Sequence, residues 1–259
     1  MRVFKDIPYD VRTDEQRLDL YLPESNEFSV FVYFHGGGIE VGDKYDDKMF
    51  SRFLTDRGVA FATANYQMYP NAKYPDFIND AASAVSWVMN NISSYGKCKG
   101  VFVGGSSAGA YLSMMLCFDK RYLGTFGFDP LEISGWLHDA GQPTTHFNVL
   151  KERGIDSRRV IVDEASPLYH VGEALSYSPM TFIVSDNDMA VRYEQIMLMI
   201  STLKSFGVED TVKLKTMNGT HCKYVYKLDE RGEPVFGNII LDFIGEVTVN
   251  RTRRHSENT

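Results

Sequence analysis

The stretch VFVGGSSAGAYLSMM, residues 101–115, contains two adjacent serines within a cluster of glycines. A nucleophilic serine on a sharp strand-to-helix turn has a strained backbone, so the residues two before and two after it must be very small. Gly105 and Gly109 meet that requirement for Ser107, and the neighbours of Ser106 meet it less well. The pattern G-x-S-x-G therefore predicts Ser107 as a nucleophile.

The residues on both sides of this motif match the strand and the helix that such a turn joins. Residues 100–103 form a short apolar run closed by glycines, which is typical of a buried strand. From Ala108 onward, Tyr111, Met114 and Met115 recur at helical spacing. The context therefore favours a catalytic turn over an ordinary glycine-serine loop.

Strands alternate with helices along most of the chain. The segments VFKDIPYDV and RLDLYLP are expected to form an antiparallel opening pair. Further strands are expected at SVFVYFH, VAFATANY, FDPLEISG, PMTFIVSDND and TVKLKTM, and further helices at residues 46–56, 76–94, 190–206 and 235–249. This order predicts an α/β fold with a mostly parallel central sheet flanked by helices and with ligands at the carboxyl ends of the strands.

Residues 136–178 interrupt this alternation, because they show helical pieces but no convincing strand. An insertion of this length, placed before the strand PMTFIVSDND, is usually functional, so a lid or a substrate wall is expected. The chain is expected to form a single domain over residues 1–250, followed by a disordered tail at residues 251–259.

The composition narrows the class of protein. The 259 residues are 44% hydrophobic, enough for one domain with a large core, and the net charge of −7 argues against nucleic acid or an anionic membrane as a partner. The N-terminal stretch lacks the apolar core of a signal peptide, and no apolar run reaches the length of a membrane span. Three cysteines without metal-ligand spacing predict free thiols and a cytoplasmic location. No metal or organic cofactor is expected, and the oligomeric state is left open.

Three blocks, YFHGGGIEVGDK, NYQMYPNAKYPDFINDAASAVSWV and GGSSAGAYLS, resemble corresponding blocks of α/β-hydrolase esterases related to hormone-sensitive lipase. The resemblance covers the core of the chain and departs from the family in two ways. His35 already opens the H-G-G-G block, which leaves no room for the helical cap that often begins such chains, and Gln67 replaces a usual arginine. Both departures are typical of small, minimally capped esterases, which include carbohydrate deacetylases and feruloyl esterases.

The resemblance implies an oxyanion hole made by the backbone N–H groups of Gly37, Gly38 and Ala108. Attack on an ester places negative charge on the former carbonyl oxygen, and each fixed donor aimed there contributes about 3–4 kcal/mol. His35 is then expected to shape this loop and not to act as the catalytic base.

In this fold the nucleophile is followed along the chain by an acid and then by a histidine. His221 follows the last expected core strand and is the predicted base. His138, His146 and His170 fall in the insertion, where a wall or solvent-facing role is expected, and His255 falls in the tail. Asp186 and Asp188 both lie at the end of the segment PMTFIVSDND, and the family pattern matches Asp188.

The expected function is hydrolysis of short-acyl esters, with acetylated carbohydrates as a candidate class, through an acyl-enzyme on Ser107. A short acyl group is expected because the insertion shows no long apolar face and carries many charges: Asp139, Lys151, Glu152, Arg153, Asp156, Arg158 and Arg159. The alternatives on the same triad are a feruloyl esterase or an arylformamidase-like amidase, although the oxyanion loop of arylformamidases typically carries an aromatic residue where this chain has Gly38. A non-catalytic receptor for a small ligand is the remaining alternative.

Overall fold

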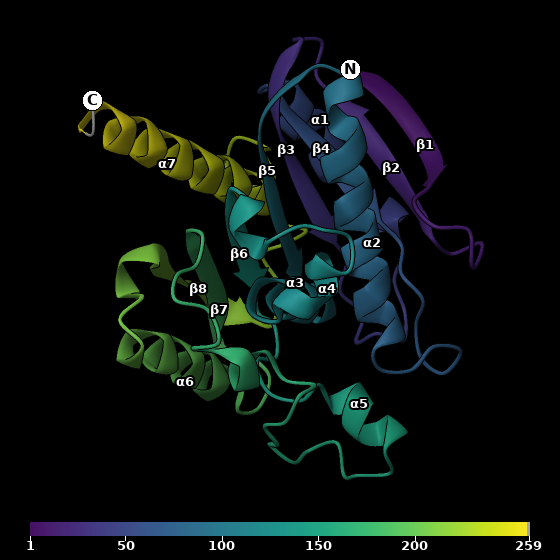
Figure 1. The fold of residues 1–259 in the computed structure, drawn as a ribbon, viewed down its shortest axis with the longest axis vertical. Coiled ribbons are helices and arrows are strands. Elements are labelled where there is room, and N and C mark those ends of the chain that lie inside the picture. The colour runs from purple at the N-terminus through teal and green to yellow at the C-terminus, as the bar shows by residue number, and fades with distance from the viewer. Residues whose placement is uncertain (258–259) are drawn as a thin grey trace.

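The computed structural model describes residues 1–257, with side chains described at residues 1–46 and 49–251. Eight strands form one sheet in the order β1-β2-β4-β3-β5-β6-β7-β8 (Figure 1). Their bounds are Arg2–Pro8, Arg17–Leu22, Glu27–Phe34, Val59–Ala64, Lys97–Ser106, Gly135–Asp139, Met180–Asn187 and Val212–Thr220 for β1 to β8. The strand β2 pairs antiparallel with β1 and β4, and the remaining pairs are parallel. The predicted α/β fold with a mostly parallel sheet is confirmed.

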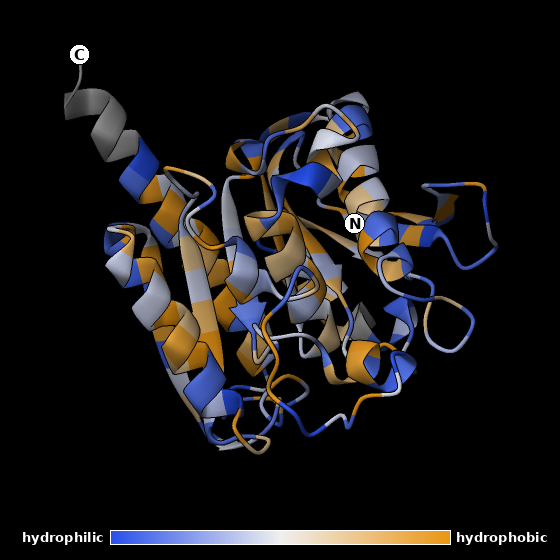
Figure 2. Cartoon of the chain, turned by 60° about the horizontal axis from the view of Figure 1, so that its bottom comes forward, coloured by the Kyte–Doolittle hydropathy of each residue, from blue (hydrophilic) through white to orange (hydrophobic). Residues whose placement is uncertain are grey.

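Helices cover both faces of the sheet. Their bounds are Lys48–Thr55, Asp76–Asn91, Ala108–Phe118, Lys120–Gly124, Phe147–Glu152, Arg192–Ser205 and Val235–Glu257 for α1 to α7. Side chains of α2, α3 and α6 belong to one hydrophobic core, and those of α1 and α7 belong to a second core. Figure 2 shows hydrophobic residues along the central strands and on the helices that flank them.

The strand β3 shows how the sequence divides its side chains between these two cores. Val30, Val32 and Phe34 pack into the first core, whereas Phe31 and Tyr33 pack into the second. Successive side chains of a strand point to opposite faces of the sheet. A continuous apolar run is therefore required here, and the sequence SVFVYFH supplies it.

The structure corrects the prediction for residues 128–139. The segment FDPLEISG is not a strand, because Asp129 and Glu132 form a capping box around a short 3-10 helix at Pro130–Glu132. The strand is β6, which lies between β5 and β7 in the sheet and takes the first residues assigned to the insertion. The insertion therefore begins at residue 140, and Asp139 is a buried strand residue instead of a surface charge.

The three histidines assigned to a wall or to solvent are also placed differently. His138 lies in β6 and is fully buried, and burial lowers its pKa to about 3. His146 and His170 are 2% exposed and belong to the packed interior of the insertion. The insertion shows no regular hydrophobic periodicity, so its sequence did not indicate that these histidines are buried.

The C-terminal helix α7 is longer than expected. It continues through Glu257, so the domain end predicted at residue 250 falls inside this helix and the predicted tail is largely helical. The last two residues of that predicted tail, 258–259, lie outside the described residues. In the part of the chain that is described, no helix has the length and hydrophobicity needed to cross a lipid bilayer.

Candidate active site

The structure brings Ser107, His221 and Asp188 together from three separate loops. Ser107 lies on the turn between β5 and α3, Asp188 follows β7, and His221 follows β8. His221 Nε2 is 2.8 Å from Ser107 Oγ, and His221 Nδ1 is 2.5 Å from Asp188 Oδ1. With Nδ1 donating to the carboxylate, Nε2 is left as the acceptor for the serine proton.

The turn that carries Ser107 explains the glycine pattern around it. Ser107 has φ 54° and ψ −112°, in the left-handed half of the backbone map that a non-glycine residue rarely adopts. A Cβ at Gly109 would lie 1.9 Å from the Phe34 carbonyl oxygen, and one at Gly105 would lie 2.4 Å from the Gly109 carbonyl carbon. Both positions therefore require glycine, as the sequence motif indicated.

Two aspartates lie at the end of β7, Asp186 within the strand and Asp188 just after it, and only Asp188 contacts the histidine. The side chain of Asp188 is fully buried and accepts backbone hydrogen bonds from Ser185 and Met189 in addition to the one from His221. Burial opposes its ionisation, but these hydrogen bonds outweigh burial and hold the pKa of Asp188 below its ordinary value. Asp186 is exposed and accepts a hydrogen bond from the Gly219 N–H at 2.9 Å instead.

The glycine loop after β3 lies against the nucleophile. A Cβ at Gly36 would be 3.4 Å from Ser107 Cβ, and Gly37 and Gly38 both have positive φ, at 106° and 68°. Ala108 begins α3, so its N–H is among those with no carbonyl partner inside the helix. The three backbone groups predicted as oxyanion donors thus belong to two segments that meet at Ser107.

His35 supports this loop from below and does not contact Ser107 or Asp188. Its ring stacks on Tyr66 with centroids 4.5 Å apart, and its Nδ1 lies 2.7 Å from the Gly36 carbonyl oxygen. Burial lowers the pKa of His35. A buried, neutral ring in this place fits the structural role expected for it.

Asp139 is a residue of this site that the sequence analysis missed. It ends β6 beneath the serine turn, where its backbone carbonyl accepts the Ser107 N–H at 2.7 Å. Its buried carboxylate accepts hydrogen bonds from Ser106 and Tyr224, and burial raises its pKa to about 6 despite these bonds. Its sequence context, Trp-Leu-His-Asp, gives no clear strand signal, and the sequence analysis therefore places these residues in the insertion.

An open cavity of about 600 Å³ lies over the triad. Its walls combine the glycine loop with apolar side chains and two carboxylates, and they include Val41, Phe147, Met189, Tyr226, Glu40 and Asp46. The Cys222 thiol also lines the cavity, 3.7 Å from His221 Nε2, and burial raises its pKa. All three cysteines are free thiols, as predicted. Within the described residues, no group of three His, Cys, Asp or Glu side chains is placed to hold a metal ion.

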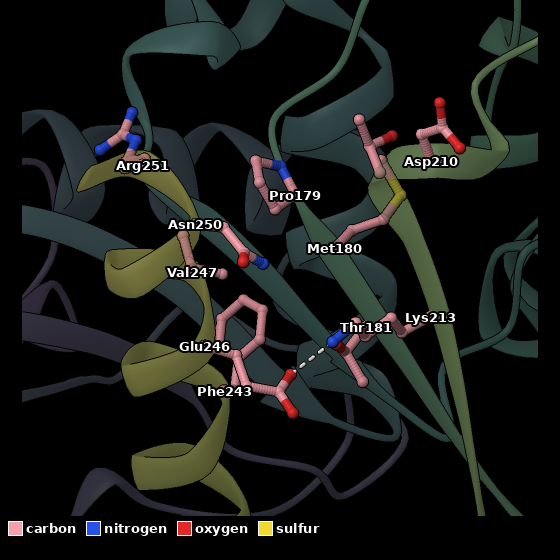
Figure 3. A pocket seen from close by; sticks show the side chains of 11 residues that line it. Pro179, Met180, Thr181, Asp210, Lys213, Phe243, Glu246, Val247, Asn250 and Arg251 are labelled. Carbon is pink, nitrogen blue, oxygen red and sulfur yellow. Dashed lines mark hydrogen bonds and ion pairs between the residues drawn. The ribbon is translucent and has the colours of Figure 1, made fainter. Parts of the chain in front are cut away.

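A smaller hollow lies far from this chemistry, between α7 and the first residues of β7 and β8 (Figure 3). It measures about 70 Å³, and Phe243 and Val247 form part of its wall. Lys213 and Glu246 at its edge pair with each other at 2.7 Å. Because no histidine, cysteine or serine lines it, this hollow offers no alternative to the Ser107 site.

Comparison with solved structures identifies the fold. Esterase B from Lactobacillus rhamnosis superposes over 100% of this chain and 89% of its own, with a TM-score of 0.79 at 17% sequence identity. The chain has the α/β-hydrolase fold. The family model described as BD-FAE matches residues 18–125, which include the glycine loop and the serine turn.

Curated relatives match less than half of this chain. A probable isoprenylcysteine alpha-carbonyl methylesterase of Arabidopsis thaliana is 33% identical over 107 residues, which are 40% of this chain and 25% of that protein. A kynurenine formamidase of Danio rerio is 27% identical over 113 residues, which are 43% of this chain and 37% of that protein. The matched region thus spans only about a quarter of the methylesterase.

Proposed function

We propose that this α/β-hydrolase is a serine carboxylesterase that hydrolyses short-acyl esters through an acyl-enzyme on Ser107. The observation that carries the proposal is the line of hydrogen bonds from Ser107 Oγ through His221 to Asp188, beside an open cavity. A serine hydroxyl is a weak nucleophile until an adjacent base accepts its proton, and His221 is in contact to do so.

Each residue has a defined task in the proposed reaction. Ser107 Oγ attacks the ester carbonyl carbon while His221 Nε2 takes its proton, and the N–H groups of Gly37, Gly38 and Ala108 stabilise the oxyanion. His221 then gives that proton to the departing alcohol, which leaves the acyl group on Ser107. A water molecule, deprotonated by His221, attacks the acyl-enzyme and releases the acid, and the proton returns to Ser107.

The comparisons support an ester as the substrate. The BD-FAE family model covers the segment that carries the glycine loop and the serine turn, and a probable methylesterase is among the relatives. Esterase B has also been solved with a tributyrin phosphonate inhibitor. For this chain, the charged insertion and the carboxylates in the cavity wall favour a short acyl group, and the open cavity leaves space for a sugar on the alcohol side.

Titration with an organophosphate ester tests the nucleophile. We expect complete loss of p-nitrophenyl acetate hydrolysis at one equivalent of bound phosphoryl group, with the adduct on the peptide that contains Ser107. The Ser106→Ala variant should take up the same label, and Ser107→Ala should take up none. A protein that hydrolyses no ester and takes up no label would instead be a non-catalytic receptor.

Similarity to a kynurenine formamidase makes amide hydrolysis the second candidate. The same triad would attack a formamide carbonyl, so the geometry of Ser107, His221 and Asp188 does not separate the two reactions. A substrate panel does: p-nitrophenyl acetate, acetylated sugars and feruloyl esters on one side, N-formylkynurenine on the other. A higher kcat/KM for N-formylkynurenine than for every ester would replace the esterase proposal.

A further inference from the structure

A second cavity lies beside the catalytic one. It has a volume of about 430 Å³ and shares Phe147 and Met189 with the wall of the catalytic cavity. Its other walls come from residues 157–159 of the insertion and from the beginning of α6. In Figure 1, α5 and the rest of the insertion lie beyond one end of the sheet, and α6 begins at that same end. The catalytic cavity and this second cavity therefore adjoin at Phe147 and Met189.

The lining of the second cavity is cationic although the chain as a whole has a net charge of −7. Arg158, Arg159 and Arg192 contribute to it, and no aspartate or glutamate lines it. Arg158 is exposed and already pairs with Asp156 at 2.5 Å. The concentration of positive charge in one hollow of an acidic protein indicates an anionic ligand.

Arg192 is the buried charged side chain in the wall of this cavity. Its side chain is 4% exposed, and its two hydrogen bonds go to neutral acceptors, the Ala140 carbonyl and the Gln142 carboxamide oxygen. Burial lowers its pKa to about 10 although the charge of Asp188 opposes that shift, so it stays charged at neutral pH. No carboxylate lies within ion-pair distance of it among the described residues, and a buried cation without a direct anionic partner is costly, so an anion in the cavity would compensate it.

The beginning of α6 adds to the same field. Its N-cap residue, Val191, makes no side-chain capping hydrogen bond, and the Arg192 N–H is bonded to the Met189 carbonyl. The positive end of the helix dipole lies in the cavity wall, whereas Glu194, the acidic residue of this first turn, does not line the cavity. Gln195, also in the wall and 6% exposed, has a carboxamide oxygen without a hydrogen-bond partner. That oxygen can accept only from a donor, such as a hydroxyl group on the ligand.

We propose that this cavity is a subsite for an anionic group, a carboxylate or a phosphate, carried by the alcohol portion of the ester. The inference rests on the proposed ester hydrolysis. The alcohol portion is assigned because the proposed acyl group is short, so the part of the substrate that extends past Phe147 and Met189 into the second cavity belongs to the alcohol. The substrates favoured on this basis are acyl esters of hydroxy acids or of phosphorylated alcohols.

A matched pair of esters tests the subsite. 4-Acetoxyphenylacetate and its methyl ester share the acyl group and the phenol but differ by one negative charge. We expect kcat/KM for the anionic ester to be at least about ten times that for the methyl ester, because only the anion forms a charge-assisted hydrogen bond in the cavity. A third ester with a phosphate in place of the carboxylate shows which anion is preferred. Equal values for the charged and neutral esters overturn the inference.

Arginine variants test whether a preference for the anionic ester arises from this cavity. The ratio of kcat/KM between the charged and neutral esters should approach one in Arg158→Gln/Arg159→Gln and should fall in Arg192→Lys, which keeps a charge but loses the planar fork. Lys204→Gln removes an exposed charge at the other end of α6 and is the control in which the ratio should persist. An unchanged ratio in both arginine variants, or a preference for charge on the acyl group instead, would refute the assignment.

A binding measurement separates this inference from the proposed function. Calorimetric titration of the wild-type protein with 4-hydroxyphenylacetate should give measurable binding that weakens with added salt, whereas its methyl ester should bind at least about tenfold more weakly. If the neutral ester is not hydrolysed, the esterase proposal fails while this titration still decides the anion site. Equal binding of acid and methyl ester rejects the anion site even in an active esterase.

Discussion

Ser106 and Ser107 are consecutive, yet their hydroxyl groups contact different partners. Ser107 Oγ lies 2.8 Å from His221 Nε2, whereas Ser106 Oγ donates to Asp139 Oδ2 at 2.5 Å and accepts from Tyr33 at 2.8 Å. The two serines are therefore not redundant, because one contacts the candidate catalytic histidine and the other is held by a buried carboxylate and a tyrosine.

Replacing each serine by alanine should separate these two roles. Ser107→Ala should lower ester hydrolysis by several orders of magnitude because it removes the nucleophile. Ser106→Ala should keep most of the activity but lower the free energy of unfolding by about 1–3 kcal/mol, since it removes a buried hydrogen bond from Asp139. Initial rates on p-nitrophenyl acetate and urea unfolding measure both effects. Equal activity losses would show that the nucleophile is misassigned.

Asp186 and Asp188, at the end of β7 and just after it, provide a second matched pair. Asp188→Asn should lower kcat at least about a thousandfold, because an amide facing His221 Nδ1 favours the wrong imidazole tautomer. Asp186→Asn keeps an oxygen that can accept from the Gly219 N–H and should stay close to wild type. Steady-state kinetics on one ester suffice for the comparison, and the reverse ranking would transfer the acid role to Asp186.

Asp139 should make stability depend on pH in a defined direction. Burial raises its pKa in the folded protein to about 6, whereas the pKa of an aspartate in an unfolded chain is about 3.9. The folded state therefore holds this proton more tightly, and the free energy of unfolding should decrease as the pH rises through this window, by up to about 3 kcal/mol.

The Asp139→Asn variant isolates that contribution because it has no proton to lose at this position. Urea unfolding of both proteins between about pH 4 and about pH 7 should show the stability of wild type, relative to the variant, decreasing as the pH rises. A difference that stays constant across this range would mean that Asp139 is ionised throughout.

Acyl chain length should be limited by the walls around the triad. A lipase-like site stabilises a long chain by about 0.8 kcal/mol for each buried methylene, which requires a continuous apolar surface. The catalytic cavity includes Glu40 and Asp46 in its wall, and the neighbouring cavity is lined by arginines. We expect kcat/KM on p-nitrophenyl esters to be highest for acetyl to butyryl chains and to fall steeply by octanoyl. A maximum at octanoyl or beyond would contradict this assignment of the walls.

Much of the fold was predictable because its signals are local. Continuous apolar runs predicted the buried strands β3, β4 and β7, and the small residues Gly105 and Gly109 identified the turn at Ser107. The strand β6 was missed because its five residues, GWLHD, are all buried and include a histidine and an aspartate. A buried polar residue has no signature in the sequence when its partners lie far away along the chain.

The sequence by itself indicated the proposed serine chemistry and its candidate nucleophile, since a strained serine turn requires glycines that can be recognised within five residues. Tertiary structure alone decided which neighbouring groups meet. Asp139 lies 83 residues before Cys222 and 85 before Tyr224, yet it contacts both beneath the serine turn. The cationic cavity likewise joins the insertion to the start of α6. Burial and charge at such places depend on distances that folding sets between remote segments, and no local pattern encodes them.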